Sequence, residues 1–139
     1  MVTKDLTMLN AKDVIKMGVI SSRTLMVTQD LTANQRYPEL PSVLATAEMI
    51  FAMECAAADS IKNMLPAGFV SVGTNVDIEH LAATPVGETI IASAKVSGIE
   101  EKTVIFTVEA HDQHTIIGRG EHKRGIVNLE RFLEKIDAR

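Results

Sequence analysis

The chain has 139 residues, of which 46% are hydrophobic and 23% charged, a composition typical of a folded globular protein. Its net charge of -4 and its 4% of aromatic residues exclude a broad basic surface for nucleic acid and a stacking platform for unpaired bases. With one cysteine, Cys55, no disulfide can form within the chain. The length suits one domain, residues 1–139, that folds without a metal.

The sequence predicts a cytoplasmic protein that does not enter a membrane. Its first residues lack the apolar core of a signal peptide. The longest uncharged run lies between Lys62 and Asp77, is too short to span a bilayer and is interrupted by Pro66.

The first predicted elements are a short helix and a strand. Asn10 is suited to cap a helix over Ala11–Met17, and Gly18 is suited to end it. The stretch Arg23–Thr32 has the residues of a strand. The two prolines of Tyr37–Pro41 then prevent that connector from being helical throughout.

A long helix is predicted over Val43–Met64, with Ser42 as its cap. Its alanine, methionine and leucine residues favour helix, and it contains no glycine or proline. Between Glu48 and Asp59 the only charged residue is Glu54. A helix that is apolar nearly all round is expected to be enclosed by other parts of the molecule.

Four strands and an amphipathic helix are predicted after the long helix. Their ranges are Phe69–Ala83, Glu88–Ile99, Thr103–His111 and Thr115–Asn128, with the helix over Leu129–Ile136. Because the links are short, we expect consecutive strands to form antiparallel hairpins.

Apolar and polar residues alternate along these strands, which predicts a sheet with one buried face. In the first strand, Val70 and Val72 are expected on that face together with Val76 and Ile78. One enclosed helix and one antiparallel sheet predict an α+β fold in which the sheet curves around the helix.

Three ionisable side chains interrupt the predicted apolar surfaces. Glu54 must be paired or reach water, because an isolated buried carboxylate costs on the order of several kcal/mol; it could be a general base or bond a neighbouring chain. His80 shares the buried face with Ile78, and could be a core histidine or, next to a helix with a buried glutamate, part of a site. Arg124 could clamp carbonyl or phosphate oxygens, or pair with a surface carboxylate.

The other polar candidates carry weaker signals. Thr46 could bond a backbone carbonyl of its own helix, and Gly73 could allow a close approach to its backbone. The remaining histidines, His111, His114 and His122, are not favoured as site residues. No spacing of histidine, cysteine or carboxylate matches a metal site.

Three blocks of the sequence resemble the fluoroacetyl-CoA thioesterase family of hot-dog fold proteins. They are VLATAEMIFAMECA, SVGTNVDIEHLAATPVGETI and AHDQHTIIGRGEHKRGIVNLERF, and the similarity extends over about residues 37–133. The resemblance implies a hot-dog fold and a homodimer, possibly a higher oligomer, with sites at the interface. It implies catalytic roles for Thr46, Glu54 and His80, and contacts to an acyl-CoA substrate by Gly73 and Arg124. No cofactor is expected, because CoA is part of the substrate.

The segment before the long helix differs from that of the family. The characterised member has a longer segment that bears phenylalanine and acts as a lid, whereas here only Tyr37–Leu40 corresponds to it, without phenylalanine. We therefore expect hydrolysis of a different short acyl-CoA. A hydratase or dehydratase acting on enoyl thioesters and a non-catalytic acyl-CoA-binding protein are the alternatives.

The spacing of Thr46 and Glu54 limits the geometry of the site. Eight residues along a regular helix separate two positions by about 12 Å, so the two side chains cannot touch. Either the first turn is irregular or the site includes a second copy of the chain.

Overall fold

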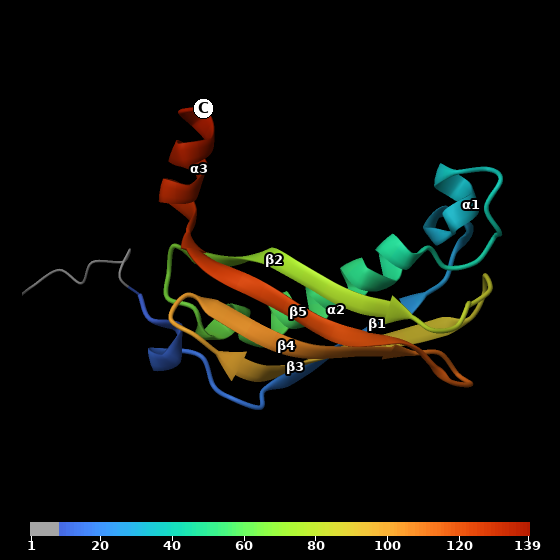
Figure 1. Cartoon of the computed structure of the whole chain (residues 1–139), viewed down its shortest axis with the longest axis horizontal. Coiled ribbons are helices and arrows are strands. Elements are labelled where there is room, and N and C mark those ends of the chain that lie inside the picture. The colour runs from blue at the N-terminus through green and yellow to red at the C-terminus, as the bar shows by residue number, and fades with distance from the viewer. Residues whose placement is uncertain (1–8) are drawn as a thin grey trace, which may run out of the picture.

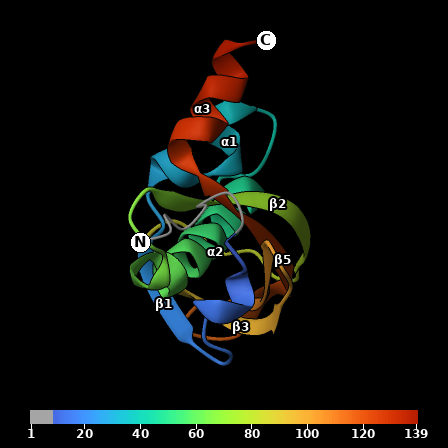
Figure 2. The same ribbon diagram turned by 90° about the vertical axis from the view of Figure 1, so that its left-hand side faces the viewer.

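The computed structural model describes residues 9–139 and confirms the predicted α+β fold. The long helix α2 (Thr46–Ile61) lies inside the curve of a five-stranded antiparallel sheet, as Figure 1 and Figure 2 show. The strands are β1 (Ile20–Met26), β2 (Phe69–His80), β3 (Thr89–Ile99), β4 (Thr103–His111) and β5 (Ile116–Asn128). Residues 1–8, part of the segment in which no signal peptide is expected, lie outside the described residues.

The order of the strands across the sheet is β1-β3-β4-β5-β2, with every neighbouring pair antiparallel. The hairpins β3–β4 and β4–β5 confirm the prediction, but the expected hairpin of β2 with β3 is wrong. The eight residues between these strands can reach about 27 Å, and they have to cross only three strand spacings, about 14 Å. The link therefore crosses one end of the sheet and leaves β2 as an edge strand.

Two predicted elements near the N-terminus are shorter or displaced. The helix expected over Ala11–Met17 is only a 3₁₀ turn, Ala11–Asp13, because backbone bonds from Ala11 to Glu101 and from Gly18 to Val96 hold this segment against the sheet. The strand expected over Arg23–Thr32 is β1, and its pairing with β3 ends at Met26.

The long helix also begins later than predicted. Val43 and Leu44 form β-bridges with Pro85 and Thr32, so their backbone is extended and α2 starts at Thr46. After Ile61 the helix tightens into a 3₁₀ turn, Lys62–Met64. These bridges fix the start of α2 beside the segment that follows β2.

A bulge in β2 reverses the alternation of its side chains. Gly73 pairs with Arg124 and Asn75 pairs with Lys123, so Thr74 has no partner on β5. Even-numbered residues of β2 therefore point to one face of the sheet before the bulge and to the other face after it. The prediction that Val70 and Val72 share a face with Val76 is wrong, whereas His80 faces α2 as expected. Val76 stays 44% exposed because it lies on the edge strand.

The core forms where α2 packs on β1 and β3. The helix buries Met49, Ala52, Met53, Ala56, Ala57 and Ile61. Small residues on β3, Ala92 and Ala94, let the helix approach the sheet closely. Gly118 on β5 has a similar role, since a Cβ there would lie 2.5 Å from the Met49 sulfur.

Two further helices lie at opposite ends of the molecule (Figure 1). The short α1 (Ala33–Arg36) precedes α2, and α3 (Leu129–Asp137) continues from β5, as the sequence predicts. Within residues 9–139, no helix is long and apolar enough to cross a membrane.

Candidate active site

Thr46 and His80 meet where the start of α2 reaches the end of β2. The Thr46 Oγ1 lies 2.8 Å from the His80 Nδ1. The backbone bond from the Leu44 N–H to the Thr84 carbonyl holds the two segments together. The predicted candidates Thr46 and His80 are therefore direct partners.

The second ring nitrogen of His80 is free to act on another group. Its Nε2 is buried, and none of the residues 9–139 forms a hydrogen bond with it. If Nδ1 accepts the Thr46 hydroxyl proton, Nε2 carries the ring proton and can donate it; in the other tautomer Nε2 is a base. A buried nitrogen without a partner is unfavourable, which points to a ligand or a second chain at this position.

An apolar pocket of about 380 Å³ adjoins this pair. Its walls include Leu40, Pro41, Val43, Leu44, Leu81 and Ala82. The segment that covers it is longer than the expected Tyr37–Leu40, since Ala33 of α1 also lines the pocket. No charged side chain of the described residues lines it besides the ionisable His80.

Arg124 of β5 belongs to a second group of polar residues, which lies beside the middle of α2. Its Nη1 is 3.9 Å from the Glu54 Oε2. Its Nε and Nη2 donate to the hydroxyl and the carbonyl of Ser71 on β2. Burial lowers the pKa of Arg124, and the charge of Glu54 opposes this shift. Glu54 is thus paired, as its place in an apolar helix requires.

His122 completes this group, although the sequence analysis did not favour it as a site residue. Its ring is buried and stacks on Phe106, its Nδ1 lies 2.8 Å from the Asn75 carbonyl, and its Nε2 lies 3.2 Å from the Arg124 Nη1. Because a carbonyl can only accept and a guanidinium can only donate, the ring is neutral, with its proton on Nδ1. Burial lowers the pKa of His122 and favours this neutral form. The sequence feature that could have identified His122 is its position two residues before Arg124, on the same face of β5.

Gly73 lies opposite Arg124 in the same group. A Cβ at this position would lie 3.3 Å from the Glu54 Oε2 and 3.3 Å from the His122 Cε1. A side chain would therefore crowd the carboxylate and the imidazole. Glycine keeps the backbone of β2 close to Glu54.

The five candidates form two groups rather than one. Thr46 and His80 are at one end of β2, whereas Gly73, seven residues earlier, lies beside Glu54 and Arg124. Seven residues of strand span about 23 Å, so within one chain Glu54 and His80 do not act on the same atom. Among the described residues, no three histidine, cysteine, aspartate or glutamate side chains gather in an arrangement that could hold a metal.

Known proteins resemble this chain along most of its length. The family model described as fluoroacetyl-CoA-specific thioesterase matches residues 27–130. The fluoroacetyl-CoA thioesterase of Streptantibioticus cattleyicolor is 33% identical over 131 residues, which cover 90% of this chain and 94% of that enzyme.

Solved structures agree with this similarity. A phenylalanine-to-alanine variant of the fluoroacetyl-CoA-specific thioesterase, in complex with fluoroacetate and CoA, superposes with a TM-score of 0.80 at 32% identity, covering 85% of this chain and 99% of that one. A hot-dog-like protein from Thermanaerovibrio acidaminovorans shares the fold, with a TM-score of 0.83 at 23% identity over 91% of this chain and 93% of that one. The predicted hot-dog fold is thereby confirmed. The chain belongs to the fluoroacetyl-CoA-specific thioesterase family and is a thioester hydrolase.

Proposed function

We propose that the protein is a homodimeric thioesterase that hydrolyses a short, uncharged acyl-CoA at a site made by Thr46, Glu54, His80, Gly73 and Arg124. The observation that carries this proposal is the buried, unpartnered Nε2 of His80, oriented by Thr46 next to an apolar pocket. The related enzyme from Streptantibioticus cattleyicolor, a fluoroacetyl-CoA thioesterase, supports the reaction type.

The pocket beside Thr46 and His80 suits an aliphatic acyl group. Its apolar walls favour burial of methylene groups, each worth about 0.8 kcal/mol. An acyl group that ends in a carboxylate would be left without a cationic partner there. Leu40 and Pro41, rather than a phenylalanine, cover the pocket, which leaves room for more than a two-carbon acyl group.

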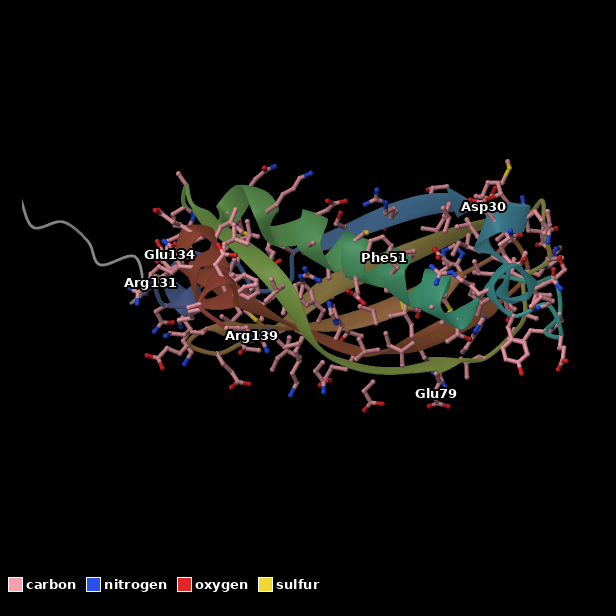
Figure 3. All side chains as sticks on the ribbon, turned by 90° about the horizontal axis from the view of Figure 1, so that it is seen from above. Asp30, Phe51, Glu79, Arg131, Glu134 and Arg139 are labelled. Carbon is pink, nitrogen blue, oxygen red and sulfur yellow. The ribbon has the colours of Figure 1, made fainter. Side chains whose placement is uncertain are left out.

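A second copy of the chain would bring the two groups of candidates together. The outer edge of β2 has no neighbouring strand in the described sheet, and unpaired edges favour pairing with another strand. If two β2 strands pair antiparallel around a twofold axis between Val76 and Asp77, Gly73 of each copy lies opposite His80 of the partner subunit. Phe51 of α2 is 60% exposed, and Figure 3 shows it on the outer side of the helix, available for burial in such a dimer.

In this dimer each residue has a defined task. The carbonyl oxygen of the thioester lies against the backbone N–H of Gly73, and Arg124 supports the negative charge that develops on it. Glu54 either takes the proton of a water molecule whose oxygen attacks the carbonyl carbon, or attacks that carbon itself to form an anhydride that water then hydrolyses to the free acid and Glu54. A carbon–oxygen bond forms, the carbon–sulfur bond breaks, and His80 delivers a proton to the departing thiolate. Thr46 holds the imidazole in the required orientation.

The test measures the release of free thiol from acetyl-, butyryl-, hexanoyl- and succinyl-CoA. We expect turnover of the butyryl substrate and little turnover of the succinyl substrate. Glu54→Gln and His80→Ala should each lower kcat by roughly 10²- to 10⁴-fold, the usual contribution of a general acid or base.

Matched controls are Glu48→Gln on the same helix and His114→Ala in the β4–β5 turn, both of which should keep wild-type turnover. Near-normal kcat in Glu54→Gln and His80→Ala, with unchanged thermal unfolding, would refute the proposed site. With an enoyl-CoA as an additional substrate, loss of enoyl absorbance without thiol release would instead indicate a hydratase.

A further inference from the structure

One buried titratable side chain has no task in the mechanism proposed above. His122 on β5 is fully buried, and Phe106 of β4 stacks on its ring. The Nδ1 of the ring lies 2.8 Å from the Asn75 carbonyl oxygen on β2, and the Nε2 lies 3.2 Å from the Arg124 Nη1. Both nitrogens are therefore used, which fixes the ring in one orientation and one tautomer.

The position of the Arg124 Nη1 depends on His122. The Nε and Nη2 of Arg124 donate to the hydroxyl and the carbonyl of Ser71. Within residues 9–139, the Nη1 has a single hydrogen-bond partner, the Nε2 of His122. Because the Nη1 carries two hydrogens, the second is left for another acceptor once His122 has taken the first. His122 thus decides where this second hydrogen lies.

Three side chains converge on the backbone of Gly73. The Glu54 Oε2 is 3.9 Å from the Arg124 Nη1, which is longer than a direct hydrogen bond of about 2.7–3.2 Å. A Cβ on Gly73 would lie 3.3 Å from the Glu54 Oε2, 3.3 Å from the His122 Cε1 and 3.6 Å from the Arg124 Nη1. An oxygen atom bound in this space can accept the second Nη1 hydrogen and remain close to Glu54. The proposed function places the thioester oxygen at the same position.

Only the neutral ring of His122 can hold Arg124 in this way. The Asn75 carbonyl needs the proton on Nδ1, and the guanidinium needs the lone pair on Nε2. Protonation would put an N–H on Nε2, opposite an N–H of a second cation. Two donors of like charge repel each other, so the bond between His122 and Arg124 would be lost.

The charged groups around His122 come from two elements. They are Arg124 on β5 and Glu54 on α2, where Cys55 also acts on Arg124. The groups that β2 and β4 present to the ring, a carbonyl and an aromatic ring, are uncharged. Burial has the largest effect and lowers the pKa of His122; the hydrogen bond to Asn75 and the charge of Glu54 oppose this shift, and the charge of Arg124 adds to it.

We propose that His122 is a positioning residue, which holds the Arg124 guanidinium beside Glu54 and Gly73 while its ring is neutral and releases it when the ring is protonated. His122 touches no reacting atom and acts through Arg124. The site then loses activity in acid through His122 as well as through its catalytic groups. The inference rests on the proposed function, in which Arg124 supports the charge that develops on the thioester oxygen.

Two substitutions of His122 separate its two hydrogen bonds. The amide of glutamine lies near the place of Nε2 and can accept from Arg124, whereas the amide of asparagine lies near the place of Nδ1 and reaches only Asn75. With butyryl-CoA, His122→Asn should lower kcat about tenfold at unchanged KM, because a small misplacement of a group that acts in the transition state lowers kcat. His122→Gln should keep most of the wild-type kcat. The control is His114→Gln, which changes a side chain that is 74% exposed and should have no effect.

The pH dependence of kcat is a second readout, which also serves if His122→Asn does not fold. The wild-type kcat should fall as the pH decreases from about 6.5 towards the lower pKa of folded His122. In His122→Gln this fall should be smaller, because only Glu54 and His80 still titrate in the site. Equal kcat in the Asn and Gln variants, or the same acid loss in the Gln variant and the wild type, would overturn the inference and leave the thioesterase standing.

Nuclear magnetic resonance tests the hold on Arg124 without activity. In isotope-labelled protein at neutral pH, exchange between the Nη1 and Nη2 signals of Arg124 should be at least about tenfold faster in His122→Asn than in the wild type, because one hydrogen bond to a charged group no longer opposes rotation. His122→Gln should exchange slowly. Equal exchange rates in all three proteins would overturn the inference. If the wild type releases no thiol from any acyl-CoA, the proposed function is refuted, and these exchange rates alone decide whether His122 holds Arg124.

Discussion

Thr46 and His80 form a two-residue pair beside an apolar pocket, whereas Glu54 and Arg124 belong to a network of charged and polar groups. In the network each of the three guanidinium nitrogens of Arg124 has a hydrogen-bond partner, and His122 bonds on both sides of its ring. In the pair, the Nε2 of His80 has no partner among the described residues.

This difference shows which groups needed for thioester hydrolysis each region lacks. The network can stabilise negative charge and activate water, but none of its residues lines the apolar pocket beside Thr46 and His80. The pair has such a pocket and a free imidazole nitrogen, but no carboxylate. Each region lacks what the other holds, and our account joins them across two copies of the chain.

The largest effect is expected in the network. Arg124→Gln removes the cation beside Glu54 and the donor to the His122 Nε2, and should lower kcat by roughly 100-fold, as the loss of one oxyanion donor does. The control is Arg119→Gln, an exposed position on the same strand. Equal turnover in both variants would show that Arg124 does not take part in catalysis.

A smaller effect is expected where β5 supports the pair. In Gly118→Ala the new Cβ would lie 2.5 Å from the Met49 sulfur and 3.1 Å from the Glu79 carbonyl oxygen, so the buried Met49 side chain must move and the backbone of β2 must give slightly. We expect a loss of about 1–3 kcal/mol in the free energy of unfolding, measured with urea, together with reduced turnover. Gly125→Ala, whose Cβ would meet nothing closer than 3.4 Å, is the control. Equal stability of the two variants would contradict this account of helix placement.

The smallest effect concerns the protonation of His122. Burial lowers the pKa of His122 in the folded chain below its ordinary value of 6.5, so the unfolded chain binds more protons at mildly acidic pH. The wild type should therefore lose stability as the pH falls from about 6.5 towards the lower folded value, and should not lose it above 6.5.

In His122→Asn this part of the pH dependence should disappear, which urea unfolding between pH 5 and pH 8 can measure. The control is His114→Asn, which replaces an exposed histidine and keeps His122 in place. The same slope in His122→Asn and wild type would show that His122 is not the titrating group.

Burial patterns predicted the strands well and singled out two of the candidate residues. Glu54 in its apolar helix and His80 on the inward face stood out in the sequence, because a charge or an imidazole among apolar residues needs a partner. The strand β4 and the helix α3 were predicted almost to the residue.

The errors arose where the structure depends on pairing between strands far apart in the sequence, which the local alternation of apolar and polar residues does not reveal. The bulge at Thr74 shows no signal in the alternation, yet it reverses the faces of Val70 and Val72. Short links suggested a hairpin of β2 with β3, but only the full sheet shows that β2 pairs with β5. His122 was missed because its partners, Asn75 and Phe106, come from other strands.

The most direct test of the account mixes two inactive variants, Glu54→Gln and His80→Ala, after reversible unfolding or co-expression. If each site takes Glu54 from one chain and His80 from the partner, half of the dimers are mixed and each of these holds one intact site, so about one quarter of wild-type turnover should return. Turnover of the mixture no higher than the average of the two separate variants would contradict a site shared between two chains.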